Sequence, residues 1–342
     1  MIMKDLKIGI LGATGAVGRQ MLTVLEERNF PVSDLRLFAS KKSAGTRIRG
    51  FGREWTVEET DIERFKGLDL LLGAAENNIA EQYLPEAVKL GVQVVDNSSA
   101  FRLDPEIPLV IPEVNPEDVR QSKGLIANPN CATIIALTAV NALHRYAHIR
   151  RMIVSTYQAV SGAGKEGIDE LRQEVSALCE GKDCPAPKVF QYQIAYNLIP
   201  QIGGFNELGY SSEEMKMQNE GRKMFHDESL LVNCTCVRVP VFRSHSESIT
   251  LEFDREITPE KARELLKEAP GVKLYDEPNE KIYPMPLLTS DQDLVYVGRI
   301  RRDLSAPAEL YNKSLTLFCC ADQIRKGAAT NAVQIAELLF RE

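Results

Sequence analysis

A strand, a glycine-rich turn and a helix follow one another at the start of this chain, and this unit constrains the fold more than any other feature. Lys7 to Leu11 is a short run of β-branched and leucine residues, Gly12-Ala-Thr-Gly15-Ala-Val-Gly18 comes next, and an amphipathic segment runs from Val17 to Arg28. In such a turn, bare backbone N–H groups and a helix N-terminus can face a pyrophosphate. We therefore expect a nucleotide-binding domain, because a plain glycine turn leaves three regularly spaced glycines unexplained.

Apolar strand-like and helical segments continue to alternate as far as residue 127. This alternation predicts an α/β domain of the Rossmann-like type, with a parallel, doubly wound sheet. The expected strands are 35–39, 68–74, 92–96, 109–111 and 125–127, and a helix is expected at 79–90.

The pattern changes after a helix expected at 132–147. Longer strand-like runs are now joined by longer excursions, which predicts a second, α+β domain with a mixed, largely antiparallel sheet. Its expected strands are 150–160, 231–241, 248–253, 294–301 and 314–321, and its expected helices are 166–180, 212–225 and 259–267. The alanine-rich amphipathic segment 327–340 is expected to return to the first domain. The predicted division is therefore 1–130 plus 325–342 for the first domain and 131–324 for the second.

Charge and cysteine content narrow the class of protein. The 342 residues include 41 Lys and Arg against 48 Asp and Glu, and the formal charge of −7 argues against a nucleic-acid partner. No apolar run is long enough to cross a bilayer, so we expect no membrane association and a cytoplasmic location. The seven cysteines are scattered without zinc-site spacing, which predicts neither a disulfide framework nor a metal site.

Cys131 lies in Ala127-Asn-Pro-Asn-Cys-Ala-Thr133, where a buried strand stops and an apolar helix begins. Unpaired backbone N–H groups and the partial positive charge of a helix start favour a thiolate over a thiol. Cys131 is thus a candidate nucleophile. The alternative interpretation is a small buried cysteine under a helix cap.

The second strand runs into Ala39-Ser-Lys-Lys-Ser-Ala-Gly45, which has no acidic residue to hold a ribose 2′-hydroxyl. Hydroxyls and two positive charges suit a 2′-phosphate, so we predict NADP with Lys42 and Ser43 at that phosphate, and Ser40 or Lys41 beside them. The alternative is a solvated basic loop.

A thiolate beside a nicotinamide can capture an acyl group as a thioester that exchanges a hydride with the cofactor. Such a site needs an acid/base, and His245 is the best candidate because its expected loop between two strands would let it reach a cleft. The alternative is an ordinary surface histidine.

Substrate anions need fixed positive charge, for which Arg102, Arg238 and Lys216 are candidates. Arg238 lies in an apolar strand and should have a carboxylate partner, either a substrate or a structural acid. Glu213 and Lys216 are one helical turn apart, a spacing more typical of a surface ion pair. Gln158 opens a glycine-rich segment that ends at Gly164, where the backbone can approach a ligand closely and Gln158 can orient an acyl carbonyl.

Together these motifs closely resemble the aspartate-semialdehyde dehydrogenase family, nearly from end to end. The matching stretches are Gly12 to Gly18, Ala39-Ser40 with Ser43 to Gly45, Val95 to Arg102, Pro112 to Asn115, Asn128 to Cys131, Gln158 to Gly164, Glu213 with Lys216, Arg238 to Val241, His245-Ser246, and Gly327 to Ala329 with Asn331 to Ala336.

The resemblance implies NADPH-dependent reductive dephosphorylation of L-aspartyl 4-phosphate to L-aspartate 4-semialdehyde and phosphate, in the biosynthesis of lysine, threonine and methionine. It also implies a homodimer or homotetramer built through the second, catalytic domain. The implied roles are Cys131 as nucleophile, His245 as acid/base, Gln158 for the acyl group, Asn130 for orienting the thiol, Arg238 for the α-carboxylate, Glu213 for the ammonium group, and Arg102 and Lys216 for the phosphate.

For the cofactor, the resemblance implies three groups of contacts. The pyrophosphate would lie on the glycine turn, and the nicotinamide would lie against the backbone of the second glycine-rich segment. The residues implied are Gly12, Thr14, Gly15, Ala16 and Val17 for the pyrophosphate, Ser40, Lys42 and Ser43 for the ribose phosphate, Ser161 and Gly162 near the nicotinamide, and Asn331 at its carboxamide.

Two departures from the family pattern affect the cofactor. Gly73-Ala-Ala-Glu-Asn-Asn78 replaces a glycine- and serine-rich loop, and Lys42 stands where an arginine is common, so it would hold a phosphate as a point charge and not as a fork. Two alternatives remain open: an N-acetyl-γ-glutamyl-phosphate reductase, and a catalytically silent relative that serves as a binding or assembly module.

Overall fold

The computed structural model describes residues 5–341 of the chain; Met1–Lys4 and Glu342, which the predicted domain ranges include, lie outside the described residues. The chain forms two compact units. The first comprises residues up to Asn130 and those from Ala328 onward, and the second runs from Cys131 to Gly327. Within the described residues, no helix has both the length and the apolar character needed to cross a membrane.

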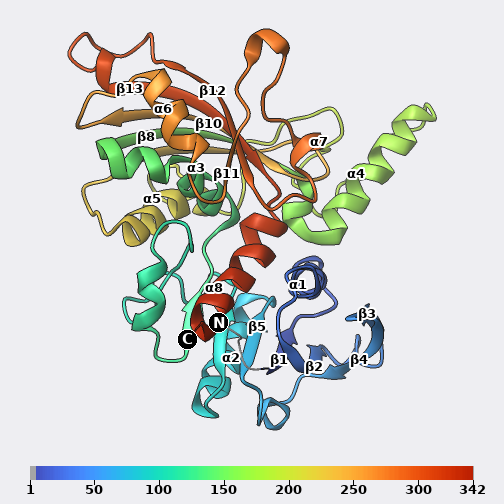
Figure 1. The fold of residues 1–342 in the computed structure, drawn as a ribbon. Coiled ribbons are helices and arrows are strands. Elements are labelled where there is room, and N and C mark those ends of the chain that lie inside the picture. Colours follow the sequence, from blue (N-terminus) through green and yellow to red (C-terminus); the bar gives the residue numbers. More distant parts are fainter. Residues whose placement is uncertain (1–4, 342) are drawn as a thin grey trace. The chain divides into compact units, whose positions relative to one another are not determined.

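The first unit contains a seven-stranded sheet in the order β3-β4-β2-β1-β5-β6-β7. Figure 1 labels β1 to β5 of this sheet. Every neighbouring pair is parallel except the hairpin between β3 and β4. The strands are β1 (Leu6–Leu11), β2 (Val32–Ala39), β3 (Arg47–Gly50), β4 (Arg53–Glu59), β5 (Leu70–Gly73), β6 (Gln93–Asp96) and β7 (Leu125–Ala127), and the helices are α1 (Ala16–Glu27), α2 (Asn77–Lys89), α8 (Thr330–Phe340) and the short 3-10 turns at Ile62–Phe65 and Pro116–Gln121.

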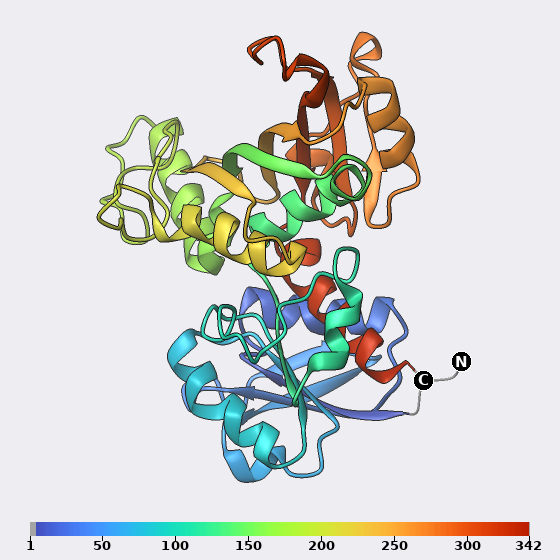
Figure 2. The same cartoon turned by 90° about the vertical axis from the view of Figure 1, so that its left-hand side faces the viewer.

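Helices cover both faces of this sheet, as Figure 2 shows for the first unit. Successive strand residues point to opposite faces. Ile8 and Ile10 pack with α1 and α8 on one face, whereas Leu11 and Leu71 pack with α2 on the other. The doubly wound α/β prediction is therefore confirmed, and α8 packs in this unit.

Two details of the first sheet differ from the prediction. The expected strand at 109–111 is wrong: only Leu109 forms a single bridge, to Ala127. Prolines at 108 and 112 flank the segment, and the Ile111 N–H donates to Asn115 Oδ1 at 3.0 Å instead of to a strand. The β3–β4 hairpin was not expected, because its charged sequence lacks a clear apolar alternation.

The second unit contains a six-stranded sheet in the order β11-β12-β13-β10-β8-β9. Three neighbouring pairs are antiparallel and two are parallel, which confirms the mixed, largely antiparallel prediction. The strands are β8 (Ile149–Gln158), β9 (Leu231–Arg238), β10 (His245–Phe253), β11 (Val272–Leu274), β12 (Val295–Arg302) and β13 (Ser314–Ala321), and the helices are α3 (Cys131–Ala147), α4 (Gly164–Cys179), α5 (Ser212–Phe225), α6 (Pro259–Lys267) and α7 (Pro286–Thr289). A 3-10 turn at Val160–Ala163 precedes α4, and a π-helical turn at Arg325–Ala329 precedes α8.

α3 packs against this sheet and against α5 and α6. Alternate residues of β10, such as Ile249 and Leu251, are buried on the α3 face, whereas Ser248 and Thr250 are only half-buried on the opposite face. One face of the sheet therefore holds the core of the unit, and among the described residues the other face carries no helix of comparable size.

His144, in the last turn of α3, makes the stability of this unit depend on pH. Its ring stacks on Phe225 at 4.0 Å, and its Nδ1 accepts the Ile149 N–H at 3.2 Å. Burial, aided by His148, lowers the pKa of His144 to about 4. The unfolded chain binds this proton near pH 6.5, so the stability associated with neutral His144 is present above pH 6.5 and is lost as the pH falls toward 4.

His144→Phe should therefore flatten the pH dependence of unfolding. The phenyl ring keeps the stacking and cannot titrate, so the variant should lose up to about 1 kcal/mol per pH unit of the wild-type slope between pH 6 and 4.5, less than one full group because the ring is partly exposed. Denaturant unfolding of both proteins across this range measures the slopes. Equal slopes would contradict the assignment.

Candidate active site

Different structural features account for the three glycines of the first turn. Gly12 has a φ of +83°, and a Cβ there would lie 2.5 Å from the Ala74 carbonyl oxygen. A Cβ on Gly18 would lie 2.4 Å from the Gly12 carbonyl oxygen. At Gly15 a Cβ would meet only the Gly12 oxygen, at 3.4 Å, among the described atoms. Packing thus requires Gly12 and Gly18, whereas Gly15 keeps space open at the start of α1.

That space belongs to a cavity of about 430 Å³ in the first unit. The lining residues come from the carboxyl ends of β1, β2, β4 and β5 and from the start of α2, namely Leu11, Gly12, Thr14, Gly15, Ala39, Ser40, Lys41, Glu59, Thr60, Ala74, Ala75, Glu76, Ile79 and Tyr83. Among the described side chains none caps the N-terminus of α1, and its first turn has no acidic residue. The open helix end and the cavity fit a dinucleotide pyrophosphate.

The predicted cofactor residues divide into two groups in this cavity. Gly12, Thr14, Gly15 and Ser40 line it, as does Lys41. The other contacts predicted for the pyrophosphate and the 2′-phosphate are absent from its lining, namely Ala16, Val17, Lys42 and Ser43. Glu59, Thr60, Glu76 and Tyr83 were missed. Glu59 pairs with Ala39 in the β2–β4 register, so recognising β4 would have placed Glu59 and Thr60 beside the second strand. Glu76 directly precedes α2, so the expected loop at 73–78 is limited to residues 74–76.

Asn331 and Arg102 both support the end of β7 in the first unit. Asn331 is fully buried, and its Nδ2 donates to Asn128 Oδ1 at 2.7 Å and to the Val110 carbonyl at 3.0 Å. Arg102 is also buried and donates to the backbone carbonyls of Asn128 and Asn97, at 2.9 and 2.7 Å. These bonds fix the segment that leads to Cys131, and an amide contact between Asn331 and a cofactor would compete with them.

In the second unit, three predicted residues form one row across the sheet. β8 ends at Gln158, β9 ends at Arg238 and β10 begins at His245. Gln158 is directly opposite Arg238 in the parallel β8–β9 pair, and the Tyr157–Ser246 pairing of β8 and β10 places His245 beside Gln158. Residues 87 positions apart therefore meet at one edge of the sheet, on its α3 face.

The expected loop position of His245 is wrong, because the residue is the first of β10 and is fully buried. The Ala159 N–H donates to His245 Nδ1 at 3.1 Å, so in the neutral ring the proton is on Nε2, which lies 3.4 Å from Gln158 Nε2. Burial and the nearby Arg238 lower the pKa of His245 to about 3, against a smaller opposing effect of Glu213. The imidazole is thus uncharged at neutral pH.

Glu213 and Lys216 are not an ordinary surface pair. Glu213 is buried; its Oε1 accepts from Gln158 Nε2 at 3.1 Å and its Oε2 from Lys216 Nζ at 2.9 Å. A capping box at the start of α5 positions them: Ser211 and Glu214 cap each other, and Glu214 also accepts the Cys236 N–H at 3.0 Å. The first turn of α5 is thereby fixed to β9 beside Gln158.

Arg238 is buried beside these groups. Its Nη1 donates to the Ala159 carbonyl at 2.6 Å. Burial lowers the pKa of Arg238, while the nearby acidic groups, Glu213 first among them, oppose that shift. A Cβ on Gly162 would lie 2.8 Å from Arg238 Nη1 and 3.4 Å from the His245 ring. Ser161, also predicted, is buried and accepts a hydrogen bond from Gln323 Nε2.

Cys131 is the first residue of α3 and is half-buried. A Cβ on Gly327 would lie only 3.0 Å from Cys131 Cβ, so a glycine is needed there for the chain to pass the thiol. Asn130, directly before it, is buried. Among residues 5–341, no group of three or more His, Cys, Asp or Glu side chains is arranged to hold a metal ion.

Comparison with known proteins identifies similar sequences over almost the whole chain. Residues 7–122 match the domain described as "Semialdehyde dehydrogenase, NAD binding domain", and residues 140–326 match "Semialdehyde dehydrogenase, dimerisation domain". The chain is 51% identical to an aspartate-semialdehyde dehydrogenase of Aquifex aeolicus over 98% of both sequences. The chain belongs to the aspartate-semialdehyde dehydrogenase family.

Other members of the family are similarly close. The Bacillus subtilis aspartate-semialdehyde dehydrogenase is 45% identical and covers 98% of both chains. A crystal structure of aspartate semialdehyde dehydrogenase II from Vibrio cholerae, complexed with ASA, superposes with a TM-score of 0.94 at 43% identity and 99% coverage of each chain. Membership of this family therefore rests on sequence and fold over almost the entire length.

Proposed function

We propose that this enzyme reduces L-aspartyl 4-phosphate to L-aspartate 4-semialdehyde and phosphate with NADPH, and that Cys131 carries the acyl group as a thioester. The activity is that of the family and serves the biosynthesis of lysine, threonine and methionine. The observation that carries the residue assignment is the buried row of Arg238, Gln158 and His245, in the same unit as Cys131. This row places a cation, an amide and a neutral imidazole in the unit that also holds the Cys131 thiol.

In the first half-reaction the Cys131 thiolate attacks the acyl carbon of the substrate. A C–S bond forms, the bond from the acyl carbon to the phosphate oxygen breaks, and inorganic phosphate leaves. Arg238 binds the α-carboxylate of the substrate and Glu213 its ammonium group, which matches their charges and burial. Lys216 and Arg102 are the proposed phosphate ligands.

Gln158, His245 and Asn130 assist the acyl transfer. Gln158 Nε2 and the Nε2–H of His245 lie side by side and are placed to donate to an acyl oxygen as negative charge develops on it. His245 is the proposed acid/base, and its neutral form carries the proton on the nitrogen that faces Gln158. Asn130, adjacent to Cys131 in the chain, is proposed to orient the thiol.

The cofactor is NADP, held by Gly12, Thr14, Gly15, Ala16 and Val17 at the pyrophosphate. Ser40, Lys42 and Ser43 are proposed at the 2′-phosphate, with Lys41 supported by its place in the cavity wall. Ser161 and Gly162 are proposed near the nicotinamide. Asn331 is proposed at the nicotinamide carboxamide, where it would give up a hydrogen bond to Asn128 or Val110. When bound, NADPH supplies the hydride that reduces the thioester carbon. Breakage of the C–S bond then releases the semialdehyde and returns the thiolate.

Two alanine substitutions in the glycine turn should separate cofactor binding from folding. Gly15→Ala has room within the protein, so it should keep the melting temperature within a few degrees and raise the Kd for NADPH by about tenfold or more, because the methyl group occupies the pyrophosphate space. Gly12→Ala should instead lower the melting temperature, because of the clash with Ala74 and the positive φ. Unaltered NADPH affinity in Gly15→Ala would argue against this cofactor position.

Initial rates of NADP reduction test the proposed reaction and its two alternatives. With phosphate present, L-aspartate 4-semialdehyde should be oxidised and N-acetyl-L-glutamate 5-semialdehyde should not, because buried Glu213 favours a free ammonium group over an acetylated amine. Activity with the acetylated substrate alone would favour the N-acetyl-γ-glutamyl-phosphate reductase alternative. Absence of activity with both, in a protein that binds NADPH, would favour the silent relative.

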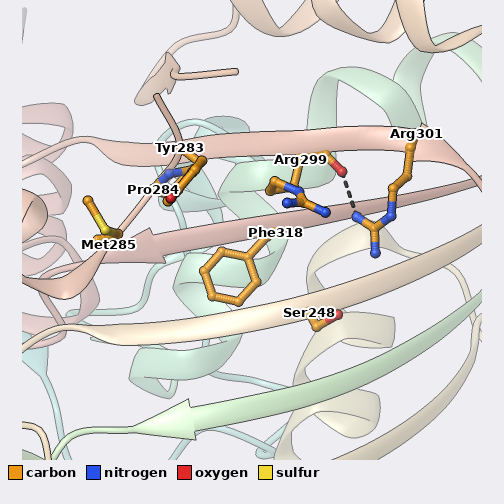
Figure 3. Close-up of a pocket in the computed structure, with 7 residues that line it drawn as sticks. All are labelled: Ser248, Tyr283, Pro284, Met285, Arg299, Arg301 and Phe318. Atoms are coloured by element: carbon orange, nitrogen blue, oxygen red, sulfur yellow. Dashed lines mark hydrogen bonds between the residues drawn. The ribbon is translucent and has the colours of Figure 1, made fainter. Parts of the chain in front are cut away.

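The proposed assembly is a homodimer, or a tetramer built from it, through the open face of the second sheet. A pocket of about 300 Å³ lies on this face, lined by Ser248, Tyr283, Pro284, Met285, Arg299, Arg301 and Phe318 (Figure 3). The match to a dimerisation domain covers these residues. Phe318→Asp should shift the mass in analytical ultracentrifugation from dimer to monomer; an unchanged mass would place the contact elsewhere.

The proposed compartment is the cytoplasm. The reaction needs a reduced Cys131, and a reducing compartment keeps cysteine thiols in that state.

A further inference from the structure

The side-chain amide of Gln158 has one defined orientation, and it is held at both ends, by Thr156 on the same strand and by Glu213. Thr156 and Gln158 are two positions apart on β8, so their side chains lie on the same face of the sheet. The Thr156 hydroxyl donates to Gln158 Oε1 at 3.0 Å. The opposite end of the amide, Nε2, therefore faces Glu213 Oε1 at 3.1 Å and His245 Nε2 at 3.4 Å.

Thr156 lies in a buried part of the sheet, where its hydroxyl has no access to solvent. Thr156 is fully buried, and its cross-strand neighbours on the same face are Cys236 on β9 and Glu247 on β10. Glu247 is buried as well; burial raises its pKa well above the usual range, and its Oε1 has no hydrogen-bond partner among the described residues. A second row, mostly uncharged, thus lies directly behind the row of Arg238, Gln158 and His245.

We propose that Thr156 is a positioning residue for the reaction, because its hydroxyl holds Gln158 with Nε2, the donor end of the amide, toward the acyl group. Without this hydroxyl only Glu213 holds the amide, at its Nε2 end. The amide then rotates more readily and presents Oε1, which would oppose an acyl oxygen that is becoming negative. Thr156 itself touches no reacting atom. This inference deepens the proposed function and rests on the assignment of Gln158 to the acyl group.

Thr156→Val tests the role with nearly unchanged shape. We expect kcat to fall about tenfold while the KM values for phosphate and NADP stay within about twofold, because one hydrogen bond that orients a donor is lost and no binding contact is removed. Thr156→Ser keeps the hydroxyl and should retain kcat within about threefold. Thr235→Val, the same change on an exposed position of β9, is the matched control and should retain full activity.

A double-mutant cycle with Gln158→Ala separates positioning from a general loss of packing. If Thr156 acts only through Gln158, then Thr156→Val should change kcat by less than about twofold in the Gln158→Ala background. Additive losses, or an equal loss in Thr156→Ser and Thr156→Val, would overturn the proposal. Melting temperatures of all variants show whether a loss follows destabilisation.

The orientation of the Gln158 amide can be measured without catalysis, so the role of Thr156 can be tested separately from the proposed function. In protein labelled with 15N-glutamine, the Gln158 side-chain amide protons should be protected from exchange in the wild type and in Thr156→Ser, and should lose protection in Thr156→Val. If the wild-type enzyme turned over neither semialdehyde, the proposed function would fail while this measurement still decided the orientation. Equal protection in all three proteins would overturn the role of Thr156.

Discussion

Cys131→Ser should reduce turnover by at least about 10³-fold, the largest effect of any single substitution in this chain. A serine hydroxyl at the start of α3 has the same place but remains protonated at neutral pH, so it cannot form the acyl-enzyme at a comparable rate. The helix start that favours a thiolate does little for an alcohol. Initial rates with L-aspartate 4-semialdehyde, phosphate and NADP measure the loss.

Binding and a second cysteine provide the controls for this substitution. NADPH affinity should be unchanged in Cys131→Ser, because the dinucleotide cavity is formed within the first unit and Cys131 lies in the second. Cys179→Ser changes an exposed cysteine on α4 and should leave kcat as in the wild type. Near-normal turnover in Cys131→Ser would rule out the thioester mechanism.

His245→Asn should lower kcat by about 10²- to 10⁴-fold, the second largest effect. The Oδ1 of asparagine can still accept the Ala159 N–H that His245 Nδ1 accepts in the structure, so the local fold is kept. The variant lacks only the Nε2–H that faces Gln158. Melting temperature and NADPH affinity should therefore stay close to the wild type while kcat falls.

The pH dependence provides an additional check on His245. Because the pKa of the buried imidazole is lowered to about 3, its protonation should not contribute an inflection to kcat/KM of the free enzyme between pH 5 and 8. Its neutral state also stabilises the fold above pH 6.5, and this contribution is lost as the pH falls toward 3. A wild-type inflection near pH 6.5 that disappeared in His245→Asn would contradict a neutral, buried His245.

Strong local patterns made much of the fold predictable. The alternation of strands and helices up to residue 127 gave the doubly wound sheet, and the bounds of α5 and α6 agree with the periodicity at both ends. The strand predicted at 109–111 was wrong because its apolar residues resemble a strand, whereas the flanking prolines prevent a hydrogen-bonded ladder. The β3–β4 hairpin was missed because it is a charged strand pair at the edge of the sheet.

Sequence patterns selected Gln158, Arg238 and His245, which the structure brings together, but they did not give the environment of these residues. His245 was expected in a loop between two strands, because the polar residues around it hide where the strand begins. It begins β10 and is buried, which lowers its pKa. Thr156 was not predicted, because its proposed role depends on the β8 register and on its hydrogen bond to the Gln158 amide, which the sequence does not show. Glu213 resembled half of a surface pair, and only the capping of α5 against β9 explains its burial.

The acyl-enzyme itself provides the most direct test of the account. The enzyme is mixed with NADP and L-aspartate 4-semialdehyde in the absence of phosphate, NADPH formation is followed by absorbance, and the quenched protein is digested for mass spectrometry. We predict a burst of about one NADPH per chain, an aspartyl group on the peptide that contains Cys131, and full turnover once phosphate is added. Steady turnover without phosphate, or a burst with Cys131 unmodified, would contradict a thioester at this residue.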